Sequence, residues 1–276
     1  MKLKNSKILI LTGKSDLSST NVMKWIHYLD NSVNIIRLNT DDLFENYSIR
    51  QEGIATPIFF SNKNADFSTD KISIVWSWKW FQPKNLTKEE ISLPIHLINK
   101  IDKSIQLERN AFFQYFLHNL NYHGCMWLNR FATSEINKLE QLQAADLIGL
   151  KTPYTFLKTK LDAKDFKTSV ITKPMSDGLG LAINDSFYRT YTSRVEKKHS
   201  NAIFSVSLFQ EEIEKEIELR VFYLDKKCYT VAILSQADPQ TAVDYRNYNY
   251  NAPSRLEYYS LPDNIEKKNC IVNGTF

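Results

Sequence analysis

The sequence predicts an α/β protein of two or three lobes, and three observations support this. A strand, a helix and a second strand open the chain, which is the order of a parallel sheet with a crossover helix. The second half carries β-rich segments separated by turn residues. The length of 276 residues is enough to bury a large core, and the hydrophobic content of 43% is typical of a globular protein and not of a disordered one.

The composition excludes several classes of protein. The formal charge of +4 comes from 35 basic and 31 acidic residues dispersed along the chain, which predicts no nucleic-acid partner. No apolar run approaches the roughly twenty residues that span a bilayer, and residues 8–11 are too few for a signal peptide, so we expect no membrane association. Cys125, Cys228 and Cys270 are far apart without a CxxC pair, and the histidines lack metal-ligand spacing. This pattern predicts reduced thiols, no metal site built from them, and a cytoplasmic location.

The N-terminal third is predicted to be structural. Residues 7–13 and 33–39 have the apolar pattern of strands, and residues 15–30 between them have that of a helix. Serine and threonine at residues 18–20 supply candidate capping oxygens for this helix. The first turn has one glycine and no GxGxxG, so a dinucleotide site is not expected there.

Two further segments, residues 54–62 and 71–81, are predicted to extend the same sheet. In the second segment Trp76, Trp78 and Trp80 alternate. Alternate residues share one face of a strand, so we interpret these side chains as a core or lobe-interface face.

The middle of the chain is predicted to be mainly helical. Residues 86–120 show apolar residues at three- and four-residue steps, and residues 125–131 have the pattern of a short buried strand. A capped helix is then expected from Ser134 to Gly149, followed by a strand after Pro153.

The residues most suited to chemistry lie between positions 169 and 251. Lys173 ends a predicted strand and precedes a loop, residues 176–180, that holds two of the seven glycines. A rigidly placed cation beneath a backbone that can fold closely is suited to binding an anion. The loop is not a Walker A motif.

Two pairs of an acid and an arginine follow, and each pair is two residues apart, so its members lie on the same face of an extended segment. Glu218 and Arg220 form the first pair, on a strand that a tight turn at residues 225–226 joins to the next. Asp244 and Arg246 form the second, in a polar loop where an arginine fork can hold a carboxylate or an acyl phosphate. The alternatives are a solvated acidic strand or helix for the first pair and a surface turn with an incidental ion pair for the second.

These features carry a resemblance to a known family. The strand ending at Lys173, the Gln-Glu-x-Ile segment at residues 210–213, the Glu-x-Arg from Glu218 and the Asp-x-Arg from Asp244 resemble the ATP-grasp ligases. They are similar, more closely, to the ATP-grasp peptide maturases of the microviridin-like (graspetide) and GRASP-with-SPASM systems.

The resemblance covers nearly the whole chain and implies an ATP-grasp fold within the α/β class. An N-terminal α/β pre-ATP-grasp domain would occupy residues 1–130, and a central ATP-grasp lid subdomain residues 131–205. Residues 206–276 would form a C-terminal ATP-grasp subdomain, which we expect to be incomplete.

The resemblance also implies roles for individual residues. ATP would be bound by the following residues: Lys138, Lys173, Gln210, Glu211, Glu212, Ile213 and Glu218. Arg220, Asp244 and Arg246 would be catalytic, with Arg220 at the phosphates and the other two at the acyl phosphate. Without the resemblance, Lys138 is interpreted as a solvated lysine on a helix.

Mg²⁺ is a further implied cofactor, but its ligands are not evident. In the resembled enzymes an Asp strand and a Glu-x-Asn strand hold the ion after the LP-x-x-I-x-x-K element, which is found here at residues 261–268. No Asp or Glu follows Glu266. We therefore expect a truncated chain that is inactive by itself, because the metal carboxylates neutralise charge on the transferred phosphoryl group.

The function implied is the maturation of a ribosomal precursor peptide, recognised through its leader and core. ATP would phosphorylate an Asp or Glu side chain, and a hydroxyl or amine would displace phosphate to give an ω-ester or ω-amide cross-link. One alternative is a glutathione-synthetase-like or glutamate-ligase-like enzyme for small substrates, and another is a non-catalytic protein that binds peptide or nucleotide. The resemblance leaves open a radical SAM/SPASM partner encoded nearby and a homodimer.

Overall fold

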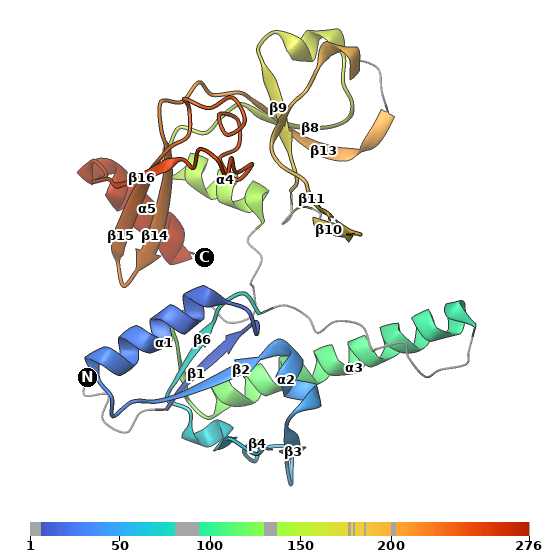
Figure 1. Ribbon diagram of the computed structural model, residues 1–276, viewed down its shortest axis with the longest axis vertical. Helices are drawn as coiled ribbons and strands as arrows, with labels where there is room; N and C mark the ends of the chain where they lie inside the picture. Colours follow the sequence, from blue (N-terminus) through green and yellow to red (C-terminus); the bar gives the residue numbers. More distant parts are fainter. Residues whose placement is uncertain are drawn as a thin grey trace. The chain divides into compact units, whose positions relative to one another are not determined.

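The structure, a computed structural model, divides into two compact units, Met1–Ser134 (unit 1) and Glu135–Phe276 (unit 2) (Figure 1). It describes the following residues: 7–80, 94–129, 137–175, 178, 180–184, 186–199 and 203–275. The boundary expected at residue 130 lies outside the described residues, and the further division at residue 205 stays a prediction.

A parallel sheet of four strands in the order β2-β1-β6-β7 forms the centre of unit 1. β1 (Lys7–Thr12) and β2 (Asn34–Asn39) pair in parallel and are joined through α1 (Leu17–Leu29). β6 (Ile74–Ser77) pairs with β1, and β7 (Met126–Trp127) pairs with β6, also in parallel. The predicted β-α-β opening with a parallel sheet is confirmed.

Helix α1 begins at a different cap from the expected one. Asp16 is the N-cap residue, and its carboxylate accepts a hydrogen bond from the Ser19 N–H at 2.6 Å. The expected capping residues 18–20 lie inside the helix instead. An aspartate just before the first turn satisfies the free N–H groups there, so the later hydroxyls are not needed as caps.

The prediction that residues 54–62 extend the parallel sheet is wrong. They contribute β4 (Phe59–Ser61) to a separate antiparallel sheet of three strands, between β3 (Ser48–Arg50) and β5 (Asp66–Ser68). Short connections allow neighbouring strands to pair in antiparallel fashion, whereas joining the parallel sheet would need a crossover. An alternating strand pattern does not say which sheet a strand enters.

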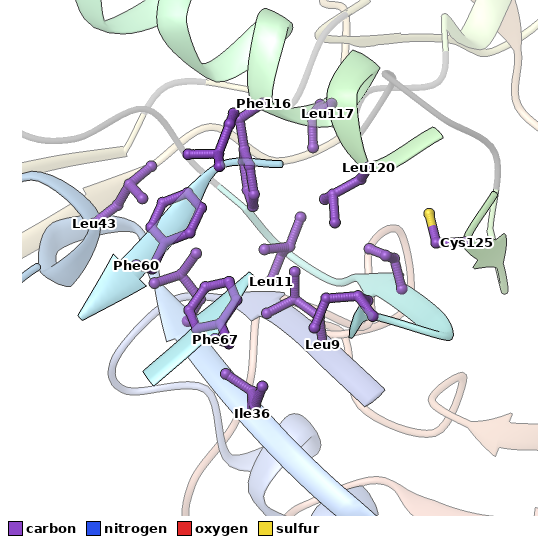
Figure 2. Packing of buried hydrophobic residues seen from close by; sticks show 14 of the residues in the cluster. Leu9, Leu11, Ile36, Leu43, Phe60, Phe67, Phe116, Leu117, Leu120 and Cys125 are labelled. Atoms are coloured by element: carbon purple, nitrogen blue, oxygen red, sulfur yellow. The ribbon is translucent and has the colours of Figure 1, made fainter. Parts of the chain in front are cut away.

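One hydrophobic core lies between the sheets and the long helix of unit 1 (Figure 2). α3 (Ile95–Tyr122) contributes Phe116 and Leu120, and β1 contributes Leu9 and Leu11, all fully buried. α3 confirms the predicted helix from residue 95 onward. The other described helices of unit 1 are α2 (Thr40–Glu45) and the 3₁₀ helix η1 (Thr69–Lys71).

The three tryptophans do not share one face of a strand. β6 ends at Ser77, and Lys79 has a φ of 52°, which turns the chain out of the extended path. Trp76 packs with the cluster that contains Ile8 and Ile10 on one side of the sheet, whereas Trp80 belongs to the other core cluster. The core interpretation therefore holds for Trp76 and Trp80, but the shared face does not.

Unit 2 contains an antiparallel sheet in the order β12-β9-β13-β8. Its strands are β8 (Thr155–Lys160), β9 (Val170–Lys173), β12 (Ser193–Arg194) and β13 (Ile203–Glu211). The hairpin of β10 (Gly180–Ile183) and β11 (Ser186–Arg189) is a separate antiparallel pair. Two 3₁₀ helices, η2 (Ala163–Phe166) and η3 (Lys197–His199), connect the strands.

A second antiparallel sheet of unit 2 has the order β14-β15-β16. Its strands are β14 (Glu218–Leu224), β15 (Lys227–Leu234) and β16 (Arg255–Tyr258), and α5 (Asp263–Thr275) packs against β15. The turn between β14 and β15 lies at Asp225 and Lys226, whose φ values of 47° and 64° are those of a type I′ turn. The tight turn expected at these two residues is confirmed.

The helix expected from Ser134 is α4 (Lys138–Leu147). Asn137 caps it by accepting a hydrogen bond from the Leu139 N–H at 3.0 Å, and Ser134 lies outside the described residues. Gly149 follows the helix with a φ of 73°, as expected of a glycine that ends a helix. None of the helices in the described part of the chain has the length and apolar character that crossing a membrane requires.

Candidate functional site

Two lysines from different elements of unit 2 lie near each other. Lys173 is the last residue of β9, as predicted, and Lys138 is the first residue of α4. The Lys138 ammonium donates a hydrogen bond to the Pro174 carbonyl, one residue beyond Lys173, at 2.8 Å. Burial lowers the pKa of Lys173, and the positive charges of Lys138 and Arg246 lower it further.

A hollow of about 330 Å³ lies beside Lys173. The end of β9, residues 206–208 in the middle of β13, and the segment with Thr190 and Tyr191 line it. Gly178 also lies close to Thr190, because a Cβ atom there would come within 2.7 Å of the Thr190 Oγ1, and its φ is +71°. Only glycine fits this position without strain, which agrees with a loop that approaches closely. The rest of the predicted glycine loop, except Gly180, lies outside the described residues.

The predicted hinge segment, residues 210–213, uses its three polar side chains to hold neighbouring strands. Gln210 is buried and donates to the Thr155 Oγ1 at 2.8 Å. The Glu211 carboxylate accepts the Tyr154 N–H at 2.9 Å. The resemblance implies a hinge that binds adenine largely through backbone groups, and the side chains of Gln210 and Glu211 instead hold the strands together.

Glu212 forms a bidentate ion pair with Arg194 of β12. The Arg194 Nη2 and Nε lie 2.6 and 2.7 Å from the two Glu212 carboxylate oxygens, and the Ser169 hydroxyl donates to the same carboxylate at 2.7 Å. The hydrogen bonds from Arg194 lower the pKa of Glu212 against the effect of burial. Within the described residues, the backbone N–H and C=O of Ile213 make no hydrogen bond. The hinge can therefore offer a ligand backbone groups only.

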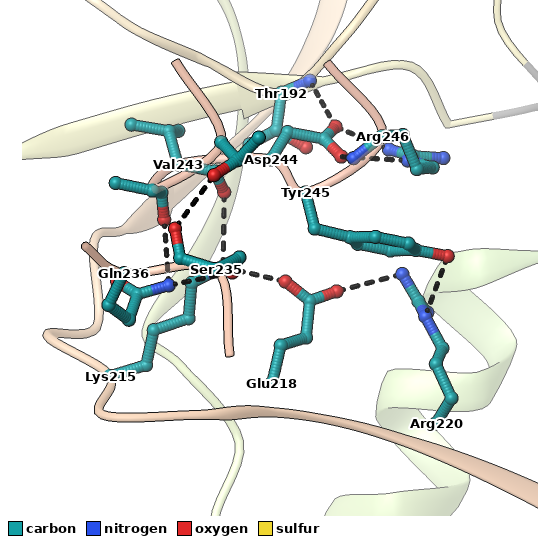
Figure 3. A network of polar contacts seen from close by, with 12 residues as sticks. Thr192, Lys215, Glu218, Arg220, Ser235, Gln236, Val243, Asp244, Tyr245 and Arg246 are labelled. Atoms are coloured by element: carbon teal, nitrogen blue, oxygen red, sulfur yellow. Dashed lines mark hydrogen bonds and ion pairs between the residues drawn. The ribbon is translucent and has the colours of Figure 1, made fainter. Parts of the chain in front are cut away.

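Glu218 and Arg220 are brought together on β14 (Figure 3). The Arg220 Nη2 donates to one Glu218 oxygen at 2.8 Å, and the Lys215 Nζ donates to the other at 2.7 Å. Arg220 also donates from Nε to the Tyr245 hydroxyl at 3.1 Å, and its guanidinium lies 4.5 Å from the centre of the Tyr245 ring. Lys215 and Tyr245 were not predicted as site residues; Tyr245 could have been noticed as the middle residue of Asp-x-Arg.

Asp244 and Arg246 form the fork that the spacing predicted (Figure 3). The Arg246 Nε and Nη2 donate to the two Asp244 oxygens at 2.8 and 2.6 Å, and the Thr192 N–H donates to Asp244 at 2.9 Å. Asp244 is buried, whereas Arg246 keeps 37% of its side chain exposed. Burial alone would raise the pKa of Asp244, but the hydrogen bonds from Arg246 and Thr192 outweigh it and hold the pKa far below its ordinary value.

These groups make a site with an excess of positive charge, which we call the cationic cluster. Among the described residues, it combines five cations with two carboxylates, an excess of three charges. Its members are Lys138, Lys173, Lys215, Arg220, Arg246, Glu218 and Asp244. Such a site attracts anions with several negative charges, and its arginines can hold phosphate or carboxylate in fixed geometry.

Comparison with solved structures identifies the fold. The chain is similar to the RiPP-associated ATP-grasp ligase of Chryseobacterium gregarium, with a TM-score of 0.80 and a sequence identity of 23%. The match covers 98% of this chain and 81% of that one. That structure contains ADP and a leader and core peptide. The macrocyclase MdnC of Microcystis aeruginosa, solved with its precursor peptide MdnA, gives a TM-score of 0.76 and 22% identity over 98% of this chain and 83% of that one. The chain has the ATP-grasp fold.

A third solved structure with the ATP-grasp fold agrees. The ligase PsnB, in a complex with a minimal precursor, Mg and ADP, gives a TM-score of 0.67 and 16% identity over 96% of this chain and 79% of that one. No protein-family model matches the sequence, and no curated protein matches it.

All ten predicted site residues lie in unit 2 of this ATP-grasp fold. The fold gathers Lys138, Lys173, Glu218, Asp244 and Arg246 into one electrostatic neighbourhood. The hinge residues stand on the neighbouring strand end with their side chains turned to structural partners.

Proposed function

We propose that this chain is an ATP-dependent ligase that activates a carboxylate side chain of a precursor peptide. The cationic cluster carries the proposal, because it places an excess of three positive charges beside an Asp–Arg fork on an ATP-grasp fold. The complexes of similar fold support the substrates: the Chryseobacterium ligase holds ADP with a leader and core peptide, and MdnC holds its precursor peptide.

In this proposal the nucleotide meets main-chain groups at the hinge and cations at the phosphates. The free N–H of Ile213 and the carbonyl of Glu212 would meet the adenine edge, and the side chains of Gln210, Glu211 and Glu212 would fix that edge in place. Glu218 would accept from the ribose hydroxyls. Lys138, Lys173 and Arg220 would bind phosphate oxygens, for which charged donors are the strongest partners.

The chemistry proceeds in two steps. A peptide carboxylate attacks the γ-phosphorus of ATP, so that a bond forms between the carboxylate oxygen and phosphorus, and ADP leaves. A Ser or Thr hydroxyl or a Lys amine then attacks the acyl carbon and loses its proton, and inorganic phosphate leaves with the electron pair of the C–O bond. Arg246, held by Asp244, would stabilise the acyl phosphate between the steps.

The PsnB complex contains Mg. Among the residues described here, no three His, Cys, Asp or Glu side chains gather as metal ligands, so we assign no step to the ion.

The remaining partners and the location are also proposed. A cytoplasmic location is consistent with the free, buried thiol of Cys125, whose pKa burial raises to about 11. A radical SAM partner and a homodimer stay predictions.

An assay of the protein tests the function. The protein is incubated with ATP, Mg²⁺ and a peptide that contains Asp or Glu together with Ser, Thr or Lys. We expect ADP to form only when peptide is present, and the peptide mass to fall by one water per cross-link. Hydroxylamine should trap the acyl phosphate as a hydroxamate when the acceptor residues are replaced by Ala.

The controls separate the alternatives. ADP formation that free glutamate supports better than peptide would favour a small-substrate ligase. Binding of ATP and peptide without any ADP formation would contradict the ligase and leave a binding protein.

A further inference from the structure

We propose that Tyr245, the middle residue of the Asp-x-Arg segment, is a positioning residue that holds Arg220 at the phosphate end of the nucleotide. The inference rests on the proposed function, because it assigns a ligand to Arg220. It goes beyond that function by giving a role to a residue that acts through its neighbour.

Arg220 needs such a partner. Its side chain is 52% exposed, and an exposed arginine samples many rotamers, which lowers its affinity for any one phosphate. Three contacts restrict it. Glu218 accepts from Nη2 at 2.8 Å, the Tyr245 hydroxyl accepts from Nε at 3.1 Å, and the Tyr245 ring centre lies 4.5 Å from the guanidinium carbon.

The ring of Tyr245 is itself well placed to act as a support. Tyr245 follows Asp244 and precedes Arg246 in the sequence. Asp244 is buried and accepts a hydrogen bond from the Thr192 N–H. Three further hydrogen bonds fix the loop: Asn249 to Asp238 at 2.8 Å, Gln240 to the Tyr248 carbonyl at 2.9 Å, and Asn247 to the Gln240 carbonyl at 3.1 Å. A loop tied at so many points can hold a ring in a constant position.

One loop therefore fixes two arginines from two sides (Figure 3). Asp244 holds Arg246 through its carboxylate, and Tyr245 holds Arg220 through its ring and hydroxyl. The loop thereby sets the spacing of two guanidinium groups, one from β14 and one of its own. A fixed spacing favours a ligand with several phosphates over a ligand with one, since both arginines are then engaged without rearrangement.

The test measures the dissociation constants of ATP and AMP for the wild-type chain, Tyr245→Phe and Tyr245→Leu by isothermal titration calorimetry. Tyr245→Phe keeps the ring and loses the hydroxyl, so we expect the affinity for ATP to fall about threefold. Tyr245→Leu loses both and should weaken ATP binding about tenfold. The affinity for AMP should change less than about twofold in either variant, because Arg220 acts on the outer phosphates.

A double-mutant cycle with Arg220→Lys identifies the partner. A lysine lacks the guanidinium Nε–H that donates to the Tyr245 hydroxyl, so Tyr245→Phe should have no further effect on ATP affinity in that background. Tyr229→Leu is the matched control, since this half-exposed tyrosine of β15 packs on Phe222. It should leave both affinities unchanged.

The outcomes are distinguishable. Equal losses for ATP and AMP in Tyr245→Leu, or additive effects in the cycle, would overturn the positioning role while leaving the proposed function intact. A wild-type chain that binds ATP no better than AMP would overturn the proposed function and this inference together. Circular dichroism and the unfolding midpoint of each variant exclude a general loss of folding.

Discussion

Units 1 and 2 both collect charged side chains near strand ends, yet they use them differently. In unit 1 the guanidinium of Arg37 donates to the Asn39 amide oxygen, the Thr20 hydroxyl and the Gly13 carbonyl, each at 2.8 Å. All of these acceptors belong to β2, to α1 or to the loop between β1 and α1. Arg37 therefore stabilises its own unit and offers little to a ligand.

Among the residues that the structure describes, the cationic cluster of unit 2 combines five cations with two carboxylates. Glu218 and Asp244 each hold an arginine, but Lys173 has a pKa lowered by burial and by neighbouring positive charge. A half-buried lysine in this state is destabilising until an anion arrives. An excess of charge of one sign therefore indicates a ligand site, whereas a dense network of polar contacts does not by itself indicate a ligand site.

The largest effect on ATP affinity is expected from removing the positive charge of Lys173. Lys173→Met should weaken ATP binding about 50-fold, since it deletes a partly desolvated donor to phosphate. Calorimetric titration measures the change. Lys160→Met, at the exposed end of β8, is the matched control and should leave affinity unchanged. Equal affinities for wild type and Lys173→Met would remove Lys173 from the site.

The second effect is on stability and depends on pH. Asp244→Asn leaves Arg246 without its buried partner, so the free energy of unfolding should fall by about 3 kcal/mol. The pKa of Asp244 is lowered in the folded chain, so its stabilisation is complete at neutral pH and is lost as the pH falls below the ordinary value of 3.8 toward the folded value. Urea unfolding of both proteins should therefore differ most above about pH 5 and converge in acid.

The matched control for this variant is Asp146→Asn, at an exposed position of α4. Its unfolding free energy should stay within about 0.5 kcal/mol of the wild type at every pH. A wild-type and an Asp244→Asn curve that run parallel from pH 7 into acid would mean that the Asp244–Arg246 pair does not form in solution.

A substitution in unit 1 should lower the stability of the protein without lowering its affinity for ATP. Arg37→Met removes hydrogen bonds to five acceptors and should lower the stability of unit 1 by about 2 kcal/mol. The affinity for ATP should change less than about twofold, because Arg37 serves only its own unit. A large loss of ATP affinity with little loss of stability would place a ligand in unit 1. That result would contradict the difference proposed between the two units.

The smallest expected effect is a proton taken up on binding. Because the pKa of Lys173 is lowered in the free chain, part of the lysine is neutral at alkaline pH, and a bound triphosphate should restore its charge. ATP titrations at alkaline pH in buffers of different ionisation enthalpy should reveal an uptake of less than about one proton. Lys173→Arg should abolish this uptake, since an arginine is always charged. Proton release instead would show that another group dominates.

The sequence was informative about positions and less so about partners. The strand that ends at Lys173, the turn at Asp225 and the fork of Asp244 and Arg246 follow from periodicity and from spacing, which are local properties. The roles of Glu211 and Glu212 were not predictable in the same way, because their partners are distant in the sequence: Tyr154 directly precedes β8 and Arg194 lies on β12. Pairing between distant segments leaves no local signal.

Two errors in unit 1 have the same origin. The strand pattern of residues 54–62 predicted β4 correctly as a strand but could not assign it to a sheet. The tryptophan pattern predicted one face, whereas the positive φ of Lys79 ends the alternation. Tyr245 was missed because an aromatic residue in a polar loop does not by itself indicate a functional role. Its role follows from its contact with Arg220, which the sequence does not show.

The most direct test of the account is hydrogen exchange, measured by mass spectrometry on the whole chain with and without ATP. The account predicts that ATP slows exchange in peptides covering residues 170–175, 210–213 and 244–246 of unit 2. It predicts no change in peptides covering residues 12–39 of unit 1. Protection confined to residues 12–39, with none in the three segments of unit 2, would contradict it.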